Sequence, residues 1–163
     1  MRRSGVTLFI ALFLGSLAHG QITTSEQARD QLNKANQFTS EQVREQIRKY
    51  GGLQAVLRQT ASKITPGQKI PGGIEITGAE ANANRLTFYH RLINEEKSDI
   101  PPIPEARRLM ASKHASTFCQ VSMLSLMIKE HEAEVRFVVA SKSGGYLFEY
   151  TFNKATCAPD YRW

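Results

Sequence analysis

The chain has 163 residues, of which 41% are hydrophobic and 22% charged; these ordinary globular values exclude wholesale disorder. Lysine and arginine number 21 against 15 aspartate and glutamate residues, which gives a formal net charge of +6. An excess of this size is typical of a solvated surface and does not by itself indicate a nucleic-acid partner.

The first 20 residues have the pattern of a secretory signal peptide. Arg2 and Arg3 precede an apolar run over residues 6–17, and small residues occupy positions 18 and 20. The run is shorter than the roughly 20 residues that a membrane-spanning helix needs. We therefore expect cleavage after Gly20 and export to the periplasm or medium. The mature chain is then expected to be soluble, with no transmembrane segment and no nucleic-acid partner.

Helical patterns dominate the chain as far as Ile64. Residues 21–38 are polar and predict a leader or a frayed helix, and residues 39–163 predict a single α+β domain. A capping-box pattern opens at Thr39, and apolar residues then recur at helical spacing on both sides of Gly51-Gly52. This predicts one kinked amphipathic helix or two short helices.

The basic residues of this region lie mostly off the apolar stripe. Arg44, Arg48 and Lys49 are suited to weak contact with an anionic surface. Such a helix more commonly packs on its own domain with its charges in water.

Four segments beyond residue 70 have strand patterns. They are Ile74–Thr77, Arg85–Ile93, Glu134–Ala140 and Tyr146–Phe152. A mostly helical segment separates the two pairs, from Glu105 to about Ile128, with a break possible near Cys119. We expect a four-stranded antiparallel sheet made of two hairpins, with the central helix packed on one face.

The chain contains two cysteines, Cys119 and Cys157. An exported chain with two cysteines favours one disulfide, which would close a loop of about 38 residues. No C-x-x-C pair is present, and three further histidines after the signal sequence do not make a regular zinc pattern. The sequence predicts a structural disulfide, no metal and no cofactor.

Residues 51–157 resemble a loosely defined group of small exported two-cysteine bacterial α+β proteins of unknown function. The resemblance is carried by the strand at residues 84–89, by Thr117-Phe118-Cys119, by the aromatic hairpin over residues 135–152 and by Thr156-Cys157. The chain departs from the group just before the third predicted strand, where Glu130-His131-Glu132 replaces the usual glycine. The resemblance implies a fold and an exported compartment but no activity.

No motif of a known catalytic class occurs, so we predict no catalytic residues. His114 and Cys119 would lie about 140° apart on one helix, and a disulfide would consume the cysteine. His90 lies on the apolar side of its strand, which is typical of a core histidine. His131, between two glutamates, is typical of a solvated turn.

One row of side chains is a candidate binding face. Tyr146, Phe148, Tyr150 and Phe152 alternate on the last strand, and such a row is either core or a platform for sugars, peptides or partner side chains. We expect a non-enzymatic envelope protein that binds another envelope protein or a cell-wall component. Two alternatives stay open. One is a cell-wall hydrolase using Glu75 or Glu149 beside His90. The other is an inhibitor or immunity-type protein with a protruding loop at residues 95–104.

Overall fold

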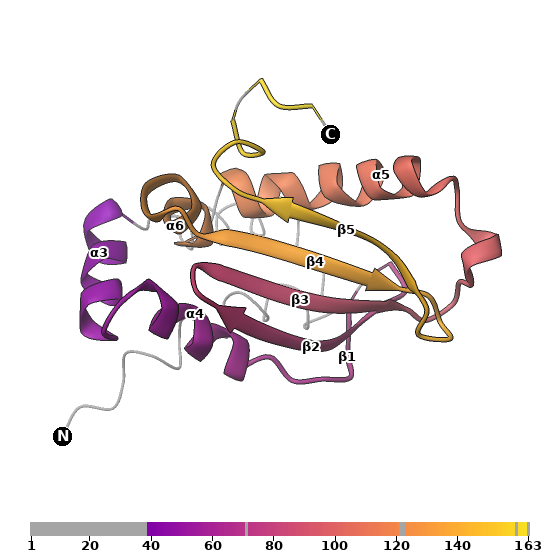
Figure 1. Ribbon diagram of the computed structural model, residues 1–163, viewed down its shortest axis with the longest axis horizontal. Helices are drawn as coiled ribbons and strands as arrows, with labels where there is room; N and C mark the ends of the chain where they lie inside the picture. The colour runs from indigo at the N-terminus through magenta and orange to yellow at the C-terminus, as the bar shows by residue number, and fades with distance from the viewer. Residues whose placement is uncertain (1–38, 71, 121–122, 159, 163) are drawn as a thin grey trace, which may run out of the picture.

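The structure is a computed structural model that describes residues 39–70, 72–120, 123–158 and 160–162 (Figure 1). The predicted signal peptide and the predicted leader lie outside the described residues. The helical elements are α3 (Ser40–Lys49), α4 (Leu53–Ser62), the short 3₁₀ turn η1 (Lys97–Asp99), α5 (Ile103–Ala115), the π-helical turn η2 (Ser116–Gln120) and α6 (Met123–His131). The strands are β1 (Gln68–Ile70), β2 (Ile74–Asn82), β3 (Arg85–Leu92), β4 (Glu134–Ala140) and β5 (Tyr146–Phe152).

The described residues form a sheet of five strands in the order β1-β2-β3-β4-β5. The pairs β1–β2, β2–β3 and β4–β5 are antiparallel, whereas β3 and β4 are parallel, with Leu86 opposite Val135 and Phe88 opposite Phe137. The two predicted hairpins are therefore present, but the prediction of a four-stranded, wholly antiparallel sheet was wrong. Between β3 and β4 the chain runs through α5, η2 and α6, and a crossover of this length returns it to the end where β3 began.

From Thr39 to Lys63, the described part of the N-terminal helical region, the chain forms two short helices. The Thr39 hydroxyl accepts a hydrogen bond from the Gln42 backbone, and the Gln42 side chain accepts one from the Thr39 backbone, which completes the predicted capping box. Gly51 and Gly52 have φ angles of 83° and 121°, which L side chains rarely adopt, and they end α3 before α4 begins. Of the predicted anionic-surface residues, Arg44 lies 3.8 Å from Glu130, and Arg48 and Lys49 are exposed. Their contact with an anionic surface stays a prediction.

One face of the sheet carries the core. Alternate residues of β3, β4 and β5 are buried together with Val56 and Leu57 of α4, and α5 packs against β5. Figure 1 shows α5 running along β5 and α4 beside β2. The other face carries three ion pairs, Arg91–Glu75, Arg85–Glu134 and Arg136–Glu149.

Candidate functional site

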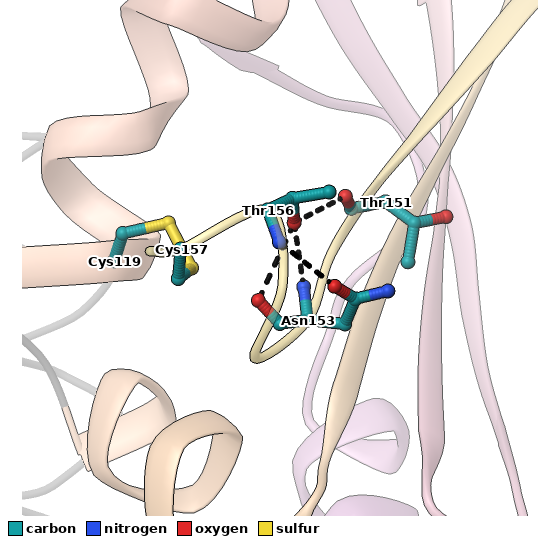
Figure 2. The surroundings of a disulfide bond; sticks show 5 residues. All are labelled: Cys119, Thr151, Asn153, Thr156 and Cys157. Carbon is teal, nitrogen blue, oxygen red and sulfur yellow. Dashed lines mark hydrogen bonds between the residues drawn. A yellow bond between two sulfur atoms is a disulfide. The ribbon is translucent and has the colours of Figure 1, made fainter. Parts of the chain in front are cut away.

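The predicted disulfide between Cys119 and Cys157 is present. The two Cα atoms are 5.1 Å apart, and both cysteines of the chain are consumed. Cys119 lies in η2, between α5 and α6, and Cys157 follows β5, so the bridge ties the C-terminal segment to the helical layer (Figure 2). A bridge of this kind is typical of proteins that fold in an oxidising compartment.

A tight turn closes the end of β5 beside the disulfide. The backbone N–H of Asn153 donates to the Thr156 hydroxyl at 2.9 Å, and the backbone N–H of Thr156 donates to the Asn153 side chain at 3.0 Å. The Thr156 hydroxyl donates in turn to the carbonyl of Thr151 at 3.0 Å, as Figure 2 shows. The turn therefore occupies the last part of the outer edge of β5 and leaves Tyr146–Tyr150 beyond it.

A bulge separates the four residues of the candidate aromatic face. Val139 lies opposite Phe148 but Ala140 lies opposite Tyr146, so Leu147 is an extra residue in β5. Leu147 and Phe148 are both buried as a result, and Tyr150 and Phe152 are buried with them. Tyr146 is 61% exposed. Of the four, only Tyr146 is largely exposed on the surface.

The buried members of that row belong to an aromatic cluster that contains two histidines. Phe137 stacks on Tyr150 at a centroid distance of 5.1 Å, and the rings of His90 and His114 lie 5.1 Å and 5.3 Å from Phe137. Nδ1 of His114 shares a hydrogen bond of 2.7 Å with the Tyr150 hydroxyl. Nδ1 of His90 is buried and has no hydrogen-bond partner among the described residues.

Burial controls the ionisation of this cluster. Burial and the neighbouring His114 lower the pKa of His90 from 6.5 to about 4, and burial and Lys113 lower the pKa of His114 to about 4. Burial also raises the pKa of Tyr150. At neutral pH all three groups are uncharged, as a packed interior requires.

The carboxylates proposed for a hydrolase lie on the opposite face of the sheet from His90. Glu75 accepts a 2.6 Å hydrogen bond from Arg91, the residue next to His90 in β3, and Glu149 accepts one from Arg136. Successive strand residues point to opposite faces, so neither carboxylate shares the side that His90 occupies. The combination of groups that the hydrolase interpretation needs does not form.

A continuous groove runs between α5 and the outer edge of β5. It consists of two adjoining hollows of about 210 Å³ and 500 Å³ that share Pro104, Arg107 and Glu149. Every residue of β5 from Tyr146 to Thr151 lines one hollow or the other. Because consecutive residues belong to both faces of a strand, the groove follows the strand's edge.

The groove is positively charged. Arg107 and Arg108 line it from α5, Arg162 lines it from the C-terminal segment, and all three are exposed. Within the described part of the chain no carboxylate forms an ion pair with these arginines, whereas Glu149 is paired with Arg136. The apolar end of the groove is formed by Ile103, Pro104 and Phe148.

Comparison with solved structures finds the same fold in secretion-related and secreted proteins. The pilotin EpsS of the Vibrio vulnificus type II secretion system matches with a TM-score of 0.53 and 14% identity, over 71% of this chain and 98% of the pilotin. A Pseudomonas aeruginosa protein described as secreted matches with a TM-score of 0.54 and 14% identity, over 68% of this chain and 96% of that one. The Vibrio cholerae pilotin AspS gives a TM-score of 0.49 at 16% identity, over 68% and 96% of the two chains. No family model and no curated protein matches the sequence.

The predicted protruding loop at residues 95–104 does not protrude freely. The Lys142 backbone donates to the Glu95 carbonyl at 3.0 Å, and Ser143 donates to the Glu96 carboxylate at 2.9 Å.

Within the described ranges no group of three His, Cys, Asp or Glu residues is arranged to hold a metal ion. None of the helices formed by those ranges combines the length and the apolar character needed to cross a membrane.

Sequence reasoning missed the groove. Its walls come from α5, from residues 146–151 of β5 and from Asn153, Thr156, Tyr161 and Arg162, and the parallel β3–β4 pairing brings α5 beside β5. The sequence feature that could have indicated the groove is the pair Arg107-Arg108, near the start of the central helix.

Proposed function

We propose that this chain is an exported, non-enzymatic interaction protein of the bacterial envelope that binds a component of an envelope assembly through the groove between α5 and β5. The observation that carries the proposal is the fold shared with the type II secretion pilotin EpsS over 71% of the chain. EpsS is a pilotin of a type II secretion system, and in this chain the same fold carries a positively charged groove.

Two further features support this function. The disulfide is typical of a protein that folds after export, and it anchors the segment that forms one end of the groove. Among the ionisable groups discussed, buried His90 and half-buried His114 are uncharged, whereas Glu75 and Glu149 are paired with arginines on the open sheet face. Such an arrangement favours binding over acid–base catalysis.

The test is site-specific crosslinking of the oxidised mature protein in envelope extract. A photoreactive amino acid replaces Tyr146 at the groove or, as the matched control, Tyr89 on the open sheet face. We expect a discrete crosslinked product from position 146 and none from position 89. Products absent from both positions, or present only at position 89, would overturn the proposal.

A further inference from the structure

Among the described residues, no strand pairs with the outer edge of β5. β5 is last in the sheet order and pairs with β4 on its other side. Such an edge presents backbone N–H and C=O groups that can pair with another extended chain, and proteins usually block it with proline, charged residues such as lysine, a very short strand, a bulge or a covering helix. β1, at the opposite edge, has only three residues. β5 has seven residues and contains neither proline nor lysine, and its bulge at Leu147 leaves the pairing with β4 regular from Phe148 onward.

The shape of the groove fits an extended chain. The hollows follow Tyr146–Thr151, and six residues of strand span roughly 20 Å. The turn at Asn153–Thr156 occupies the carbonyl of Thr151 and ends the outer edge. α5 forms the second wall, so an added strand would be held between β5 and the face of α5 that carries Ile103 and Arg107.

The charge of the groove selects the kind of segment. Arg107, Arg108 and Arg162 have no carboxylate partner among the described residues, whereas Glu149 is neutralised by Arg136. Acidic side chains would therefore complement the arginine end, and apolar side chains would complement Ile103, Pro104 and Phe148 at the other end. Residues 21–38 of this chain contain two acidic and two basic residues, so they have no net negative charge to complement the arginines.

We propose that the outer edge of β5 accepts an extended, acidic segment of a partner protein, which adds to the sheet as a sixth strand and places its carboxylates on Arg107, Arg108 and Arg162. The inference rests on the proposed function and names the chemistry of the partner. Main-chain hydrogen bonds to β5 supply the affinity, and the alternate side chains in the groove supply the specificity.

The first experiment measures peptide binding to the full mature, oxidised protein by fluorescence anisotropy. The probes are a labelled octapeptide of alternating valine and glutamate and its valine–lysine counterpart. We expect saturable binding of the acidic peptide only, weakened by salt. Arg107→Glu lowers the affinity about tenfold, whereas Arg58→Glu, a matched reversal at an exposed arginine of α4, changes it less than about twofold.

The second experiment tests strand addition itself. Alternate amides of an added strand face its neighbour, so N-methylation of one alternate set should abolish binding and N-methylation of the other set should preserve it. Equal loss from both sets, equal binding of the two peptides, or no binding of either would overturn the inference.

Other occupants of the edge give different results. A dimer in sedimentation analysis that the acidic peptide does not dissociate would assign the edge to a second copy of the chain. Binding to phosphatidylglycerol vesicles that Arg107→Glu abolishes, without peptide binding, would assign the arginines to a lipid surface. Either result would overturn the inference.

Failure of the inference is distinguishable from failure of the proposed function. If Arg107→Glu leaves the crosslink from position 146 intact, the proposed function stands and the acidic segment is wrong. If the acidic peptide binds but no envelope component crosslinks, the edge site stands and the proposed function is wrong.

Discussion

Glu132 has a left-handed backbone conformation, with φ at 57°, in the turn between α6 and β4. The Asn84 side chain donates a 2.6 Å hydrogen bond to its carbonyl and holds the turn in place. A Cβ in this region costs about 1 kcal/mol, and the group that the sequence resembles carries a glycine just before this strand. The position is therefore a local source of strain.

Replacing Glu132 by glycine should relieve that strain. We expect Glu132→Gly to raise the free energy of unfolding by about 0.5–1 kcal/mol, measured by urea denaturation. Glu132→Ala removes the charge but keeps the Cβ, so it should give no such gain. Equal effects of the two variants would show that the backbone is not strained here.

Buried His90 and half-buried His114 make stability depend on pH. Their folded pKa values of about 4 lie below the usual 6.5, so the unfolded chain binds more protons between these values. Stability is complete above about pH 6.5 and falls as the pH drops towards 4. The loss is on the order of 3 kcal/mol per histidine.

His90→Leu isolates one of the two contributions. The variant should lose about half of the pH dependence that these two histidines contribute to the unfolding free energy between pH 6.5 and 4, because His114 is then the one member of the pair left with a lowered pKa. Guanidinium denaturation at a series of pH values measures this slope. A slope identical to that of the unchanged protein would contradict the burial of His90.

At the scale of elements, the disulfide connects η2 with the segment after β5. Cys119→Ser or Cys157→Ser should lower the free energy of unfolding by about 3–4 kcal/mol, because the bridge closes a 38-residue loop. Reduction of the unchanged protein should cost a similar amount, which controls for the serine hydroxyl. A loss below about 1 kcal/mol in both cases would mean that packing alone holds the C-terminal segment.

The elements that local pattern predicts are those whose signal lies within one segment. The capping box at Thr39, the alternation in β3 and the cysteine pair are all of this kind. The three-residue strand β1 and the bulge at Leu147 have no such signal, because they depend on a neighbouring strand. Sequence alternation places Tyr146 and Phe148 on the same face of the strand. In the structure the bulge at Leu147 separates them.

At the scale of the molecule, the features that the sequence did not predict are those formed by segments that lie far apart along the chain. The parallel contact of β3 with β4 depends on the crossover through α5 and α6, and the groove depends on that crossover and on the Cys119–Cys157 bridge together. The buried state of His90 was predictable from alternation. That its Nδ1 has no hydrogen-bond partner among the described residues was not predictable, because this depends on which rings surround it.

Export is the prediction that concerns the whole chain. Mature protein recovered from the periplasm or the medium should begin at Gln21, because the small residues at positions 18 and 20 direct cleavage there. N-terminal sequencing measures this directly. Protein that begins at Met1 would show that the apolar run is not a signal peptide.

The central claim, that the edge of β5 binds a partner, is tested most directly by amide hydrogen exchange on the oxidised protein with and without the crosslinked partner. The account predicts slower exchange of the amides of Tyr146–Tyr150, whereas the β3 amides around Arg91 and the amides of α3 should exchange at unchanged rates. Protection confined to β3 or to α3, with β5 exchanging as in the free protein, would contradict it.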